Sequence, residues 1–231
     1  MGDSPFIPTC AGPVGVFIVT HESRTEVLAD TLQHFKEQGV HPHVQTQVEP
    51  PAPWRVRRGF RRGLERFSDP WPNGGILALE DDVRLRSDWR QLLEVIVAAD
   101  YPTVCCTLPI ECLPAPFSAW ARAEQDGQLH DIKVKPRVAP LVRPIAFYGT
   151  QAIYIPKWFL PHLWSLEVLH VQPPSGKAFD GLWNGWMLDN PTPVGMMVSV
   201  PDLVDHTSPQ SVLDPNRKPR KPHMFQWGIE W

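Results

Sequence analysis

Short apolar runs alternate with amphipathic stretches along the first 108 residues, and this alternation restricts the fold more than any other feature. Val14–Thr20 is rich in β-branched residues, which is typical of a strand buried on both faces. Thr25–Gln38 places Leu28, Leu32 and Phe35 on one helical face. Strands alternating with helices predict an α/β fold whose sheet is mostly parallel and flanked by helices.

The same criteria predict the remaining elements. Ser87 is suited to cap a helix that continues to Ala99, because its hydroxyl can accept a hydrogen bond from the first helical turn. The predicted strands are Val40–Val48, Ile76–Leu79, Thr103–Leu108, Ala152–Ile155 and Met196–Val200. The other predicted helices are Trp54–Phe67, Pro156–Leu166 and Phe179–Leu188.

Composition is that of an ordinary globular protein, with 42% apolar and 20% charged residues among 231. This length suits one domain, which we divide into residues 1–110, residues 111–206 and a basic, proline-rich tail over 207–231. No apolar run is long enough to span a bilayer, and the first residues lack a signal-like pattern. We therefore expect a cytoplasmic protein without membrane insertion. The four cysteines show no metal-binding spacing and no disulfide framework.

The strongest chemical signal is the acidic run Glu80-Asp81-Asp82, which follows the predicted strand Ile76–Leu79 directly. Open α/β sheets bind ligands at the carboxyl ends of their strands. Three neighbouring carboxylates repel one another unless a cation or solvent neutralises them. Hard oxygen ligands of this kind suit Mg²⁺ or Mn²⁺. The sequence therefore predicts a divalent-metal site here, against the alternative of a solvated loop.

The run from Ile76 to Val83 resembles the acidic motif of glycosyltransferases with the GT-A fold. That fold has a Rossmann-like mixed sheet, with a nucleotide-binding half and an acceptor half. Val14–Arg24 resembles the family's first strand and nucleotide-binding turn, and Gly149–Ile155 its acceptor-side strand. The resemblance implies transfer of a sugar from a nucleoside-diphosphate sugar, here a UDP-sugar, with Mn²⁺ or Mg²⁺ bound.

The resemblance also implies roles for individual residues. The donor lies near Glu80 and Asp81, with Glu80 approaching the ribose, while Asp82 holds the metal. His206 follows the last predicted strand, where the family often supplies a further metal ligand, and a neutral imidazole can ligate beside carboxylates. The turn after the first strand contacts the base and ribose through Thr20, Glu22 and Arg24. An ordinary polar loop is the alternative for that turn.

Asp180 lies where an acceptor-side helix begins. In inverting members of the family, a carboxylate at such a position takes the proton of the acceptor hydroxyl, which requires hydrogen-bond reach. A helix N-cap is the structural alternative for Asp180, and Asp189 is a second candidate for the base. No other carboxylate is placed as a nucleophile, which favours inversion over retention.

Six arginines crowd the predicted helix Trp54–Phe67, among them Arg58, and arginine forks match phosphate geometry. We expect Arg58 to contact the donor diphosphate, although a solvated helix face is the usual alternative. With the basic tail, these arginines leave open two acceptors, a saccharide or a modified DNA base of the kind that some bacteriophage enzymes glycosylate.

Three other functions remain open from the residues. One is a nucleotidyltransferase, against which the first strand lacks a glycine-rich, lysine-bearing phosphate loop. Another is a non-catalytic carbohydrate- or nucleic-acid-binding protein on the same fold. A metal-dependent nuclease is the third, against which the Rossmann-like order of the elements argues.

Overall fold

The computed structural model describes residues 4–48, 53–106, 141–144, 151–165, 196–199 and 202–207. Its strands are β1 (Phe6–Ile7), β2 (Val14–His21), β3 (His43–Gln47), β4 (Ile76–Glu80), β5 (Val83–Leu85), β6 (Thr103–Val104), β7 (Leu141–Val142), β8 (Ala152–Ile155), β9 (Met197–Ser199) and β10 (Val204–His206). Its helices are η1 (Glu22–Arg24), α1 (Thr25–Glu37), α2 (Pro53–Glu65), α3 (Trp89–Ala99), η4 (Lys157–Phe159) and α5 (Leu160–Ser165).

The main sheet has the order β1-β2-β4-β8-β6-β9-β7. Strand β3 belongs to the same sheet but lies off this order, and it pairs with β2. The sheet is mixed, because β2 is parallel to β3 and β4, and β6 is parallel to β9, whereas β8 is antiparallel to both β4 and β6. The prediction of a mostly parallel sheet is therefore wrong, since four of the seven described pairings in this sheet are antiparallel. The side-chain pattern of a buried strand is the same in either direction, so the sequence did not reveal the direction of β8.

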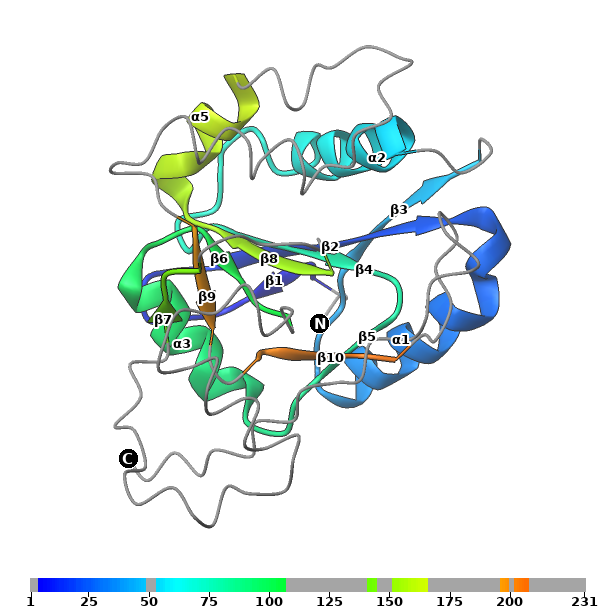
Figure 1. Cartoon of the computed structure of the whole chain (residues 1–231), viewed down its shortest axis with the longest axis horizontal. Coiled ribbons are helices and arrows are strands. Elements are labelled where there is room, and N and C mark those ends of the chain that lie inside the picture. Colours follow the sequence, from blue (N-terminus) through cyan, green and yellow to red (C-terminus); the bar gives the residue numbers. More distant parts are fainter. Residues whose placement is uncertain are drawn as a thin grey trace.

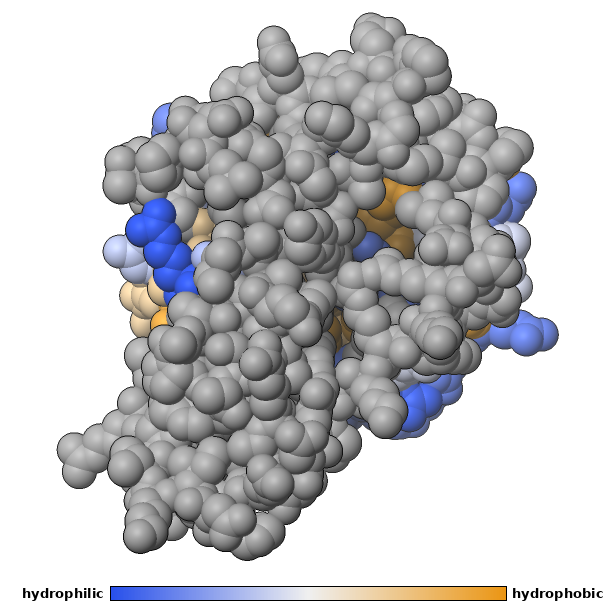
Figure 2. Space-filling view, in the orientation of Figure 1, coloured by the Kyte–Doolittle hydropathy of each residue, from blue (hydrophilic) through white to orange (hydrophobic). Residues whose placement is uncertain are grey.

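Helices cover both faces of the sheet, with α2 and α5 on one side and α1 and α3 on the other (Figure 1). Phe35 of α1 is buried, as its spacing predicts, and so is Trp89 of α3. Hydrophilic residues lie at the outer margins of the face shown in Figure 2. No described helix combines the length and the apolar character that crossing a bilayer requires.

The direction of α2 follows from three close approaches to β2. A Cβ on Gly59 would meet Val19, and one on Gly63 would meet the ring of Phe17, each closer than 3.0 Å. One on Gly15 would meet the ring of Phe67 just beyond α2, again closer than 3.0 Å. Residues further along α2 thus contact residues closer to the start of β2, so the helix and the strand run antiparallel. The amino end of α2 therefore lies over the carboxyl end of β2.

Two local predictions need correction. Helix α3 begins after Asp88, whose side chain makes no capping hydrogen bond, so the cap is not Ser87. The strand predicted over Met196–Val200 is not the last, because β10 follows it and pairs with β5. The predicted helix Phe179–Leu188 lies outside the described residues.

Candidate functional site

The acidic run lies at an edge of the main sheet where several strands end. Strands β2, β3 and β4 run in one direction, and their register pairs Val19 with Glu80 and His21 with Gln47. Strand β8 runs the opposite way and begins at the same edge, where Glu80 N–H donates to the carbonyl of Gln151 at 2.9 Å. The edge therefore collects polar residues from four strands, as the ligand-binding edge of an α/β sheet does.

Arg24 bridges two consecutive carboxylates of the acidic run. It ends the short helix η1, which continues directly from β2. Its Nε lies 2.9 Å from Asp81 Oδ1, and its Nη2 lies 2.7 Å from Asp82 Oδ2. The Arg24 side chain is 12% exposed and both carboxylates are 6% exposed, so solvent screens these ion pairs little. One guanidinium thus holds Asp81 and Asp82 in a defined orientation.

Asp81 is held by protein contacts on its side chain and on its carbonyl. Thr20 Oγ1 donates to Asp81 Oδ2 at 2.5 Å, and Thr31 Oγ1 of α1 donates to the Asp81 carbonyl at 2.7 Å. Burial raises the pKa of Asp81 above its ordinary value, whereas the Thr20 hydrogen bond and the Arg24 charge lower this pKa. These contacts fix the position of Asp81 in the turn, and they occupy the hydroxyl of Thr20 and the Nε of Arg24.

A second, two-stranded sheet carries His206 to the acidic run. Strand β10 is antiparallel to β5, with His206 opposite Val83. Thr207 fixes the junction, since both its N–H and its Oγ1 donate to the carbonyl of Asp82, at 2.7 and 3.0 Å. Only the main chain of His206 is described. The main chain of His206 is therefore adjacent to Asp82, although Thr207 and Asp82 lie 125 residues apart in sequence.

The other predicted site residues are more scattered. Glu80 ends β4 and is half-buried, while Glu22 is exposed in η1. Arg58 is exposed in the first half of α2, whose amino end lies over this same edge. Asp180 and Asp189 lie outside the described residues, as does the tail beyond Thr207.

The charge at the acidic run suits a divalent cation. Glu80, Asp81, Asp82 and Arg24 carry a formal net charge of −2 when all are ionised. Asp82 directs Oδ2 toward Arg24, and a carboxylate has about four lone-pair sites, so Asp82 can bind a metal with Arg24 in place. Among the described side chains, which exclude His206, no group of three or more His, Cys, Asp and Glu could hold a metal. A metal bound here would need ligands beyond these, and an imidazole at position 206 is chemically suitable.

Three site residues were not identified from the sequence. Thr31, Gln151 and Thr207 each bond the main chain of the acidic run, two of them through a hydroxyl. Thr31 is the one whose position gives a clue, because it lies three residues after Leu28 and four before Phe35, on the apolar face of the predicted helix. In the structure it is only 1% exposed. A buried hydroxyl requires a hydrogen-bond partner, but the sequence does not say which.

Comparison with known proteins gives little further guidance. No known protein-family model matches the chain, and neither does any curated protein. One solved structure that the chain resembles is described as the crystal structure of a glycosyltransferase involved in the glycosylation of the major capsid of PBCV-1. The resemblance covers 85% of this chain and 94% of that chain, with 12% identity and a TM-score of 0.42. The case for a function therefore rests on the chain's own residues.

Proposed function

We propose that this protein is a metal-dependent glycosyltransferase that binds a nucleoside-diphosphate sugar at the carboxyl edge of β2 and β4. One observation carries the proposal: two candidate ligands far apart in sequence, Asp82 and His206, have adjacent main chains at that edge. A loop with only a structural role does not need a carboxylate and an imidazole at neighbouring main-chain positions. The net charge of the acidic run supports the same reading, because it complements a divalent cation.

The residues of the site divide into two groups by their contacts. Asp82 and His206 would hold Mn²⁺ or Mg²⁺, which neutralises the charge of a diphosphate leaving group when bound. Thr20, Arg24 and Asp81 orient Asp82, because Arg24 links both carboxylates and Thr20 fixes Asp81. We accordingly assign Thr20 and Arg24 to positioning, and leave direct donor contact to Glu80, Glu22 and Arg58.

The acceptor half of the reaction remains a prediction. Asp180 is proposed as the base that takes the proton of the acceptor hydroxyl while the hydroxyl oxygen attacks the anomeric carbon and the nucleoside diphosphate leaves. This single displacement inverts the anomeric carbon. A UDP-sugar as the donor, and a modified DNA base or a saccharide as the acceptor, are likewise predictions.

A thermal-shift titration with UDP and UDP-sugars, with and without Mn²⁺, tests the proposal. A ligand at 100 times its Kd stabilises the folded state by about 2.7 kcal/mol, which raises the Tm of a domain of this size by roughly 5–10 °C. We expect this shift only when both metal and nucleotide are present. The variant Asp82→Asn should lose the shift, whereas Asp88→Asn, which alters a carboxylate paired with Arg86 at 3.3 Å, should keep it. An equal loss in both variants would remove the assigned role of Asp82.

One observation favours a second function, non-catalytic binding of a carbohydrate or nucleotide. Arg24 already supplies a cation to both Asp81 and Asp82, so the turn is electrostatically stable without a metal. A shift with nucleotide or saccharide that is the same with and without Mn²⁺, and the same in Asp82→Asn, would favour this alternative.

A further inference from the structure

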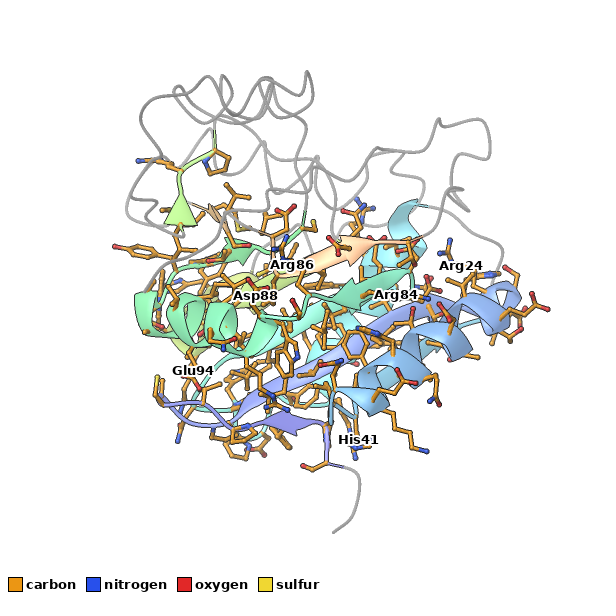
Figure 3. All side chains as sticks on the ribbon, turned by 90° about the horizontal axis from the view of Figure 1, so that it is seen from below. Arg24, His41, Arg84, Arg86, Asp88 and Glu94 are labelled. Carbon is orange, nitrogen blue, oxygen red and sulfur yellow. The ribbon has the colours of Figure 1, made fainter. Side chains whose placement is uncertain are left out.

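A cavity of about 460 Å³ opens beside the start of β3, at the opposite end of that strand from the acidic run. Its lining combines an apolar part with cationic or titratable groups. The apolar part comes from Pro5, Leu32, Val40, Pro42 and Val44, and the polar part from Lys36, His41, His43 and Arg66. No carboxylate lines the cavity among the described residues. Figure 3 shows His41 near the carboxyl end of α1, well separated from Arg24 near its amino end.

An exposed ridge of arginines leads away from this cavity. Arg58, Arg62 and Arg66 are spaced by four residues and are all exposed, so they form one stripe on the solvent side of α2. Arg66 follows the last residue of the helix, but Phe67 N–H still donates to the carbonyl of Leu64 at 3.0 Å and continues the turn. At 1.5 Å per residue, the stripe is about 12 Å long, with steps of about 6 Å.

The direction of α2 connects the two features to the candidate site. Arg66 lines the cavity, and α2 runs antiparallel to β2. Arg58 therefore lies nearest the sheet edge that carries the acidic run. The one glutamate of the helix, Glu65, is 3.4 Å from Arg61. Exposed arginines thus continue from the cavity toward the proposed active site.

We propose that the cavity and the arginine ridge form one binding track for a linear phosphate polymer. The planar guanidinium binds phosphate oxygens in pairs, and repeated arginines at regular spacing match a ligand with repeated anionic groups. Lys36, His43 and Arg66 hold one end of the chain in the cavity, and Arg62 and Arg58 lead it to the acidic edge. Binding of the phosphate polymer by this track does not depend on catalysis. A role for the track in bringing an acceptor to the acidic edge rests on the proposed glycosyl transfer.

Polyphosphate chains of graded length provide a direct probe of the track. Fluorescence anisotropy with labelled polyphosphate at low salt should show affinity that rises with chain length up to the length of the track. Arg62→Gln should weaken binding by about threefold, as expected when one exposed ion contact is lost, and should lower the salt dependence. Arg84→Gln is the matched control, because Arg84 is an exposed arginine paired with Asp30 away from the ridge. Asp82→Asn should bind polyphosphate as the unaltered chain does, even if it no longer binds nucleotide.

Three outcomes would overturn the track. The first is an affinity that does not change with chain length. The second is equal weakening by Arg62→Gln and Arg84→Gln, with both variants folded as judged by their Tm. The third is equally tight binding of polyglutamate of the same charge, which would reveal a surface attracted to any polyanion and not to phosphate.

Discussion

Replacing Arg24 with methionine keeps most of the side-chain length but removes the cation that pairs with two buried carboxylates. Arg24 lies 2.9 Å from Asp81 and 2.7 Å from Asp82. The Asp81 and Asp82 side chains are each only 6% exposed, so water cannot replace the guanidinium without local opening. The variant leaves two adjacent, buried negative charges that also repel each other.

The expected loss of stability is large. Removing one partner of a buried ion pair typically costs about 3–5 kcal/mol, because the remaining charge is left uncompensated. Native domains have unfolding free energies of about 5–15 kcal/mol, so Arg24→Met should remove a substantial part of the total. Combining it with Asp81→Asn should recover part of the loss, because one of the two uncompensated charges disappears.

The loss should also depend on pH. Burial raises the pKa of Asp81 above the ordinary value of 3.8, and the Arg24 charge opposes that rise. Without Arg24 the folded-state pKa of Asp81 rises further, so the folded state binds this proton at a higher pH than the unfolded state does. Stability of the variant therefore falls as pH rises from 3.8 toward the raised pKa, and the deficit of Arg24→Met is smaller in acid than at neutral pH.

Urea unfolding followed by tryptophan fluorescence, at neutral pH and at about pH 5, measures both effects. Arg84→Met is the control, since Arg84 and Asp30 are 2.6 Å apart but 48% and 60% exposed, and such surface pairs contribute about 0–1 kcal/mol. A loss in Arg24→Met no larger than in Arg84→Met would refute the reasoning, as would a deficit that is unchanged at the lower pH.

Three further predictions use the same structure. Thr20→Val removes the hydroxyl that donates to the buried Asp81 carboxylate, so urea unfolding should show a loss of about 1.5–3 kcal/mol, and an unchanged stability would contradict the contact. Gly63→Ala places a Cβ closer than 3.0 Å to the Phe17 ring, and the resulting overpacking should cost about 1–3 kcal/mol, seen as a lower Tm that Ala at an open surface site does not produce. Among the three cysteines described, the exposed Cys10 should react with iodoacetamide in the folded protein, although the neighbouring Glu94 raises the pKa of its thiol. The two buried cysteines should react only in urea. Peptide mapping by mass spectrometry distinguishes the three sites.

Local features of the fold were readable from the sequence. The predicted bounds of three elements lie within two residues of the observed ones. These elements are the strands β2 and β4 and the helix α1. These elements repeat a side-chain pattern over several residues, and burial of one face imposes that pattern locally. The acidic run was likewise located, because a strand followed by carboxylates places them at a strand end whatever the rest of the chain does.

The sequence by itself determined that Glu80, Asp81 and Asp82 follow a buried strand, since periodicity and order along the chain suffice for that. Only the tertiary structure decided what these carboxylates contact. The direction of β8, the pairing of β10 with β5 and the bridge from Arg24 to Asp81 and Asp82 all depend on segments that meet across the fold. Such contacts leave no periodic trace, because a two-residue pairing or one ion pair is specified by packing between distant segments and not by the residues beside it.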